Sequence, residues 1–205
     1  MPKRVDHEVR RKQIAEALVR IAGQRGLHAV GMRDVAAEAG ISLRLVQYYF
    51  QTKEKLLLYG LQHLAERFGE RVVARSRAAG ENPGPRATIE ALLMASLPTD
   101  EESRAFHLVY TSYAVLAVTD PALAAQPFIR NPDAAEKVVA GLLEQAQEAN
   151  LLQPDVDARL EAVGLLAMSA GLGISVLVGQ RSLQSAAVVL DHHLSRIFKD
   201  GAARL

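Results

Sequence analysis

The sequence predicts an all-helical protein, and three observations carry this prediction. Apolar residues recur at intervals of three and four through most of the 205 residues, which is the period of an amphipathic helix. Strand-like alternation of apolar and polar residues is absent. Glycine, proline, serine and aspartate recur between the periodic stretches, where they can end one helix and cap the next.

The first predicted helix spans about residues 6–24. Ile14, Leu18 and Ile21 share one face of it, and Gly26 follows as a stop signal. Three further helices are predicted at 32–39, 43–49 and about 53–77. The residues expected to end or cap these helices are Gly40, Ser42 and Thr52.

A change in composition separates these elements from the rest. Residues 78–88 hold two prolines and two glycines, and are interpreted as a connection. Helices are predicted beyond it at about 86–97, 101–118, 134–150, 156–179 and 183–199.

The two short helices and the turn between them, Met32 to Phe50, have the pattern of a DNA-binding helix-turn-helix. Ala36 is small where the second helix must cross closely over the first. Gly40 stands where the chain must turn, and a positive φ costs glycine nothing. The expected inner face consists of Val35, Ala39, Ile41 and Val46.

On the second helix, Arg44, Gln47 and Tyr48 fall opposite the inward-facing Val46 and Phe50. Arginine can bridge guanine O6 and N7, and glutamine can pair with adenine. Tyrosine hydroxyls and a nearby lysine can hold phosphates. Contacts with thymine methyl groups are expected from Leu43 and Leu45.

Two alternatives stay open at this point. The same geometry occurs in ordinary helical bundles, where Tyr48 or Tyr49 would be a core residue; we expect Tyr49 to be the partly buried one. Charge favours DNA binding, because residues 1–55 carry eleven Lys/Arg against six Asp/Glu, and the remainder thirteen against seventeen. The alternative is that this uneven distribution of charge along the chain arose by chance and has no role in binding.

The run from Arg10 to about Leu58 resembles the DNA-binding domain of TetR-family transcriptional repressors, through the segments AAEAGIS, LVQYYF and TKEKLL. The resemblance implies an all-helical homodimer with a ligand-binding, dimerising C-terminal domain. It implies contacts with operator DNA from Arg33, Ser42, Leu43, Arg44, Gln47, Tyr48, Tyr49, Thr52 and Lys53. The family often has threonine or serine where Gly31 stands, and smaller or polar residues at 43–45, so the operator sequence cannot be transferred.

The predicted domains are 1–52 for DNA binding and 53–205 for effector binding and dimerisation. Residues 155–199 loosely resemble the BetI-like class of TetR C-terminal domains. Two helical stripes there are predicted to form an intermolecular four-helix bundle, the alternative being that they bury only the chain's own core. The interface residues expected are Gly164, Gly171, Ser175, Val178, Ala187, Leu190, Leu194 and Ile197, with Met168 also on the first stripe.

Aromatic residues and methionines concentrate in the middle of the chain, which is typical of an apolar ligand cavity. The predicted effector pocket comprises Phe68, Met94, Phe106, His107, Tyr110, Tyr113, Phe128 and Met168. His107 is the expected polar contact. Because no cluster of charged groups accompanies it, we expect a small, largely apolar effector.

Other classes of protein are less well supported. Residues 162–180 carry no charge and approach the length of a membrane span, but a buried helix fits better. Asp191, His192 and His193 suggest a metal or an acid–base group, yet neighbouring residues on a helix point about 100° apart. Neither a nucleophile elbow nor a phosphate-binding loop appears. We therefore expect no enzyme, cofactor, metal or membrane and a cytoplasmic location; the alternative is a helical interaction protein or an enzyme without DNA binding.

Overall fold

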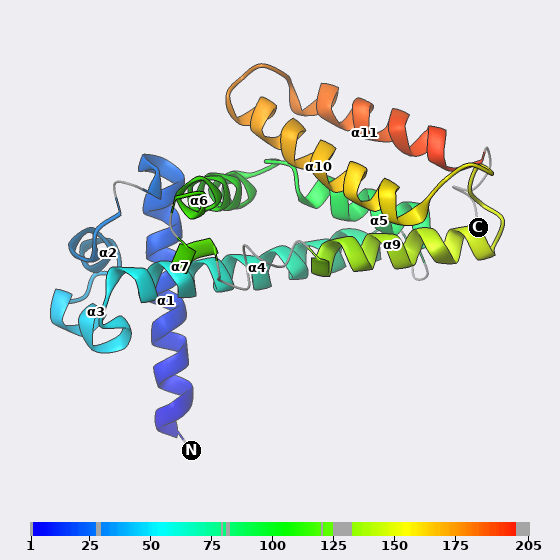
Figure 1. The fold of residues 1–205 in the computed structure, drawn as a ribbon. Helices are drawn as coiled ribbons and strands as arrows, with labels where there is room; N and C mark the ends of the chain where they lie inside the picture. The colour runs from blue at the N-terminus through cyan, green and yellow to red at the C-terminus, as the bar shows by residue number, and fades with distance from the viewer. Residues whose placement is uncertain are drawn as a thin grey trace. The chain divides into compact units, whose positions relative to one another are not determined.

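The computed structural model describes residues 2–27, 30–78, 80, 83–119, 121–124 and 133–199. All regular structure in these ranges is helical, apart from an isolated antiparallel bridge between Leu152 and Phe198 (Figure 1). The helices are α1 (Pro2–Arg25), α2 (Met32–Glu38), α3 (Leu43–Phe50), α4 (Lys53–Ala78), α5 (Pro85–Ala95), α6 (Glu101–Ala117), α7 (Pro121–Ala124), α9 (Asp133–Glu148), α10 (Ala158–Leu177) and α11 (Leu183–Ile197).

The all-helical prediction is confirmed, and each predicted helix is present with ends displaced by at most a few residues. The largest displacement is at the start of α1, which begins at Pro2 rather than near residue 6. The four-residue α7 was not predicted, since one turn is too short to establish a period.

The chain forms two compact units. The first comprises residues 1–67 and 104–129, and its core joins α1, α2 and α3 to the first half of α4 and to α6. Leu18 of α1 is fully buried against Gly60 of α4, where an added Cβ would lie 2.9 Å from Leu18 Cδ2. The packing does not separate residues 1–52 from 53–67, and a functional boundary at residue 52 stays a prediction.

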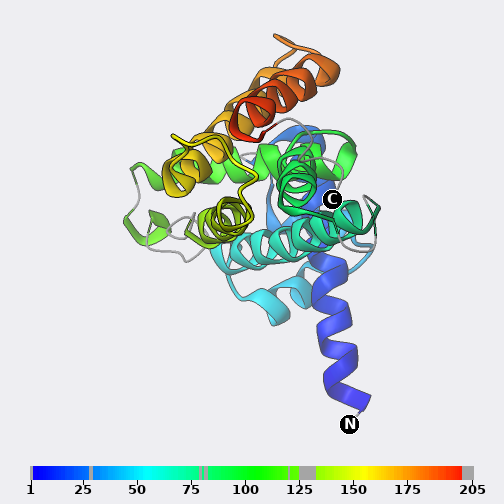
Figure 2. The same ribbon diagram turned by 90° about the vertical axis from the view of Figure 1, so that its right-hand side faces the viewer.

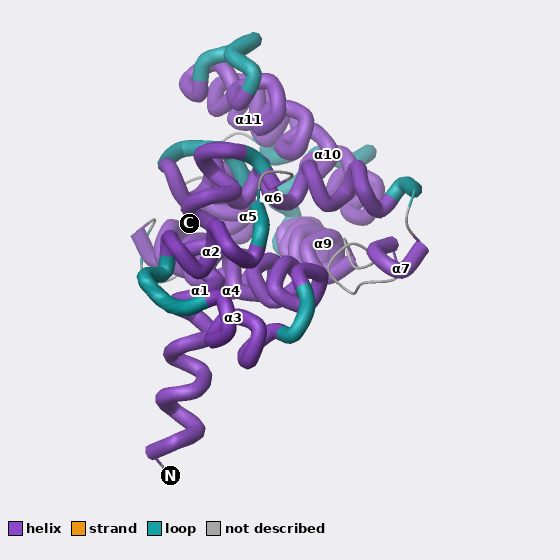
Figure 3. The backbone as a smooth tube through the Cα atoms, turned by 90° about the vertical axis from the view of Figure 1, so that its left-hand side faces the viewer, coloured by secondary structure: helices purple, strands orange, loops and turns teal. Residues whose placement is uncertain are grey.

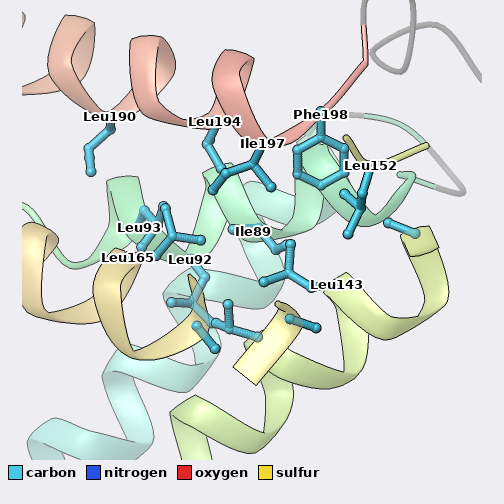
Figure 4. Packing of buried hydrophobic residues seen from close by; sticks show 14 of the residues in the cluster. Ile89, Leu92, Leu93, Leu143, Leu152, Leu165, Leu190, Leu194, Ile197 and Phe198 are labelled. Carbon is cyan, nitrogen blue, oxygen red and sulfur yellow. The ribbon is translucent and has the colours of Figure 1, made fainter. Parts of the chain in front are cut away.

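The second unit comprises residues 68–103 and 130–205. In it α10 lies between α9 and α11, and α5 packs against all three (Figures 1 and 2). Figure 4 shows the core they enclose, with Ile89 and Leu93 of α5 facing Leu165 of α10 and Leu194 of α11. Ser169 of α10 is buried in this core and donates to the carbonyl of Leu93 at 3.2 Å.

Helix α10 has two unlike faces within one chain. Ala158, Ala162, Leu165 and Leu172 are buried, whereas the opposite face is exposed although it is apolar. Among the described helices, α10 alone is long and apolar enough to cross a membrane, with 28% of its most apolar window buried. Its exposed stripe, called here the α10 stripe, consists of Leu160, Val163, Gly164, Ala167, Gly171 and Ile174, together with Val178, the C-cap residue directly after the helix.

The predicted interface is wrong for three residues of α11. Leu190, Leu194 and Ile197 are 0–3% exposed and belong to the core of their own unit. A residue enclosed by its own chain cannot meet a partner unless the unit opens. Of the other predicted residues, Ser175 and Ala187 are half-buried, while Gly164, Gly171 and Val178 lie on the α10 stripe.

Reciprocal hydrogen bonds between Asp100 and Ser103 hold the start of α6. Asp100 Oδ1 accepts from the backbone N–H of Ser103 at 2.7 Å, and the Asp100 N–H donates to Ser103 Oγ at 3.0 Å. Burial acts to raise the pKa of Asp100. The bonds from Ser103 and the charge of Arg71 lower this pKa by more, so that on balance it is depressed.

Asp100→Ala is expected to lower the free energy of unfolding at pH 7 by about 1 kcal/mol, because a helix cap is lost. A carboxyl whose pKa falls on folding stabilises the fold above its unfolded pKa of about 3.9, and this contribution disappears as pH falls through the folded value. Urea unfolding at several pH values should therefore give curves for wild type and variant that converge below about pH 4. Asparagine at position 100 can still cap the helix but does not titrate. The difference in free energy of unfolding between Asp100→Asn and Asp100→Ala should therefore persist at low pH.

Candidate nucleic-acid interface

The turn between α2 and α3 has the geometry that a helix-turn-helix needs. Gly40 has φ +65°, a conformation that a residue with a Cβ rarely adopts. The amides of Gly40 and Ile41 donate to Ala37 and Ala36 at 3.1 and 3.0 Å, which closes the end of α2. Ser42 Oγ then caps α3 by accepting from the Leu45 amide at 3.2 Å, as predicted.

The two faces of α3 are as predicted. Val46 and Phe50 are 0% and 1% exposed and pack into the first unit. Arg44, Gln47 and Tyr48 are exposed, and the Tyr48 side chain is 67% accessible. Within the described part of the chain, the side chains of Arg44 and Gln47 make no hydrogen bond or ion pair, so both are free to bind a partner.

The remaining predicted DNA contacts lie around this face. Tyr49 is half-buried, as expected, and so are Leu43 and Lys53; Arg33, Ser42 and Thr52 are exposed. Thr52 Oγ1 caps α4 by accepting from the Lys55 amide at 3.3 Å. Gly31 brings no side chain to α2, and its N–H donates to Asp34 Oδ2 at 3.2 Å instead.

An aromatic cluster connects α1 to the exposed face of α3, and sequence reasoning missed it. The ring of His7 makes edge contacts with Tyr49 at 4.6 Å and with Tyr48 at 6.3 Å between centroids. The two tyrosine rings meet each other edge-on at 5.3 Å. His7 therefore holds the N-terminal half of α1 beside the residues expected to touch DNA.

A second unpredicted cluster fixes the end of α3. The guanidinium carbon of Arg11 lies 4.2 Å from the centre of the Tyr59 ring and 5.2 Å from that of Phe50. Tyr59 donates its hydroxyl hydrogen to Glu8 at 2.5 Å. Burial, the bond to Glu8 and the charge of Glu8 raise the Tyr59 pKa, which keeps the phenol protonated as the donor. Arg11, Glu8 and Tyr59 thus position α3 through Phe50.

The residues predicted to bind an effector fall into separate groups. On α6, the Phe106 and Tyr110 rings are stacked at 6.0 Å and 8°, and His107 meets Phe106 edge-on at 6.1 Å. Tyr113 and His107 are 2% and 7% exposed. In the second unit, Met94 and Met168 are partly buried against its core and Phe68 is half-buried. Phe128 lies outside the described residues.

The residues considered for a metal are held in different pairs. Asp191 accepts from Arg86 Nη2 at 2.8 Å, while His193 Nε2 lies 3.3 Å from Glu161 on α10. No group of three or more His, Cys, Asp and Glu residues that could hold a metal occurs in the described ranges. These side chains tie α11 to α5 and to α10.

Comparison with known proteins agrees with the helix-turn-helix geometry. Residues 14–59 match the family described as bacterial regulatory proteins, tetR family, and residues 85–199 match the family described as BetI-type transcriptional repressor, C-terminal. The transcriptional regulator PksA of Bacillus subtilis is 30% identical over 178 residues, which cover 87% of this chain and 83% of that protein.

Two further relatives extend the comparison. The regulator BetI of Rhizobium meliloti is 36% identical over 101 residues, about half of each chain (49% and 48%). A crystal structure of a transcriptional regulator from Saccharomonospora viridis in complex with choline has a TM-score of 0.83 and 25% identity, covering 94% of this chain and 99% of that one.

Proposed function

Because the chain belongs to the TetR family of bacterial regulatory proteins and is a transcriptional regulator rather than an enzyme, we propose that it is a ligand-released repressor. As a homodimer in the cytoplasm it binds a two-fold symmetric operator, and a small effector releases it. Residues 1–52 form the DNA-binding part, and residues 53–205 form the part that binds the effector and dimerises.

The exposed face of α3 carries this proposal. Arg44 and Gln47 offer hydrogen-bond donors and acceptors of the kind that discriminate base edges in the major groove. Their side chains are exposed and unpaired, while Val46 and Phe50 anchor the same helix from behind. A helix that presents unpaired polar groups on a rigid base is suited to direct readout.

The α10 stripe supports the homodimer. Seven small or apolar residues form one exposed face of a helix whose other face is already in the core. Gly164, Ala167 and Gly171 would let a second α10 approach closely. In a two-fold dimer the α10 stripe of one chain packs against the α10 stripe of the other, so that both apolar faces are buried. This interface replaces the predicted one, because the apolar stripe of α11 is used inside the chain.

The stacked rings of Phe106 and Tyr110 favour a small, largely apolar effector as the ligand. Aromatic faces also hold quaternary ammonium groups, and a relative binds choline. Choline is therefore the first candidate to test, together with its neutral analogue 3,3-dimethylbutanol. Release of operator by choline alone would indicate that the cation is recognised, and release by both would indicate an apolar site.

Control of DNA binding follows from linkage between the two sites. An effector that binds better to a conformer with misplaced α3 helices shifts the population away from the DNA-competent state. Helix α4 runs without a break from residue 53 to 78, so it contributes to both compact units. It is the element proposed to transmit the change.

Selection of bound duplexes from a random pool by the purified protein tests the proposal. An enriched inverted repeat is the expected result, since two copies of α3 are related by a two-fold axis. Enrichment of a single, non-repeated motif would contradict the dimer. No enrichment at low salt, from protein shown to be folded, would contradict sequence-specific repression.

A further inference from the structure

The N-terminal half of α1 continues past the core of its unit. From His7 onward, Ile14 is the first residue of α1 in the buried core, and residues 7–9, 12 and 13 are exposed. Twelve residues of helix between Pro2 and Ile14 correspond to roughly 18 Å at 1.5 Å per residue. Figure 3 shows this segment, called here the α1 arm (residues 2–13), extending beyond α2 and α3.

The composition of the α1 arm is strongly basic. Its charged residues are five cations and two anions: Lys3, Arg4, Asp6, Glu8, Arg10, Arg11 and Lys12. One of the anions is already engaged, because Glu8 accepts from Tyr59 and lies 3.9 Å from Arg11. Between His7 and Gln13 the arm supplies no residue to the buried core, so core packing does not explain this part of the helix.

Contacts made by His7 fix where the arm runs relative to α3. Its ring packs against Tyr48 and Tyr49, so the arm passes beside the exposed face of α3 and not behind it. When α3 enters a major groove, a basic helix at this position lies next to the sugar-phosphate backbone that borders the groove. Phosphates are the partners that clustered Lys and Arg side chains favour.

We propose that the α1 arm is a second DNA-contact element, which binds duplex phosphates alongside the site read by α3. The inference rests on the proposed function, since α3 must be the element that enters the groove. The arm adds affinity and its dependence on salt without adding sequence preference, because phosphates are the same at every step.

The salt dependence of binding tests the arm directly. Each phosphate contact contributes about −0.9 to the slope of log K against log salt concentration. The double variant Lys3→Gln/Arg4→Gln removes two cations from each arm of a dimer, and we expect a slope less steep by about 2 to 4. Affinity at 100 mM salt should fall about tenfold or more, equally on operator and on unrelated duplex.

The matched control is Arg77→Gln/Lys137→Gln, which removes two exposed cations from the ends of α4 and α9. It loses the same charge and should keep the wild-type slope. Circular dichroism and thermal unfolding of both variants should match the wild type, so that a change in slope cannot come from loss of folding. A wild-type slope in the arm variant, or an equal change in the control, would overturn the proposal.

The two proposals fail in different ways. If the wild type binds all duplexes with equal affinity, and the arm variant still lowers the salt slope, the proposal of sequence-specific operator binding is contradicted. The proposal that the α1 arm binds phosphates is then supported. Enrichment of an operator with no effect of the arm variant would do the opposite. Absence of any duplex binding by the wild type would overturn both.

Discussion

Replacing Ile174 by glutamate is expected to convert the dimer into monomers and to weaken operator binding by more than a hundredfold. Ile174 is 43% exposed near the C-terminal end of the α10 stripe. In a two-fold interface the substitution places a carboxylate on both chains at once, and burying each charge costs several kcal/mol. Monomers also lose the advantage of engaging two half-sites together.

Sedimentation equilibrium of the purified variant measures the first effect, and titration of the selected operator measures the second. Val138→Glu is the matched control, since Val138 is 52% exposed on α9 and lies outside the stripe. The control should remain a dimer with wild-type affinity. A dimeric Ile174→Glu variant, or a monomeric Val138→Glu variant, would show that the interface lies elsewhere.

The helix-turn-helix could be predicted from the sequence because its signals are local. Gly40 and Ser42 act within four residues of their positions, through a positive φ and a cap, and both roles are confirmed. The division of α3 into an inner and an outer face depends on helical period alone. Val46 and Phe50 are accordingly buried, and Arg44 and Gln47 are exposed.

The interface residues of α11 could not be assigned in this way. An apolar stripe predicts that one face of a helix is buried. It does not predict whether a partner chain or the helix's own unit covers that face. Leu190 and Leu194 turned out to face α5 and α10. Deciding between the two requires knowing which face of α10 remains uncovered, and that depends on how four helices pack.

Contacts between residues far apart in the chain also could not be predicted from the sequence. Glu8 and Tyr59 are 51 positions apart, and His7 reaches Tyr48 and Tyr49 across more than forty. No periodicity relates such pairs. The surplus of basic residues before residue 55 was visible, but only the contacts of His7 place part of that charge beside α3.

Arg44→Ala is the second large effect, expected to cost about 1–3 kcal/mol in each half-site and to relax the preference at one base position. Arg44 is exposed, unpaired and on the same face as Gln47, so its donors are available to a guanine edge. Because the side chain is exposed and makes no hydrogen bond or ion pair within the described residues, its truncation should leave thermal stability unchanged. Repeating the random-pool selection with the variant measures which position loses its preference.

Lys53→Ala provides the comparison that distinguishes recognition of bases from binding to phosphates. Lys53 begins α4 beside the last turn of α3, where it is expected to hold a phosphate. Its loss should weaken binding to all duplexes similarly and reduce the salt slope by about 1 for each half-site. If Arg44→Ala also weakened operator and unrelated duplex equally, with every base preference intact, Arg44 would be a phosphate anchor and the base contacts would have to come from Gln47 and its neighbours.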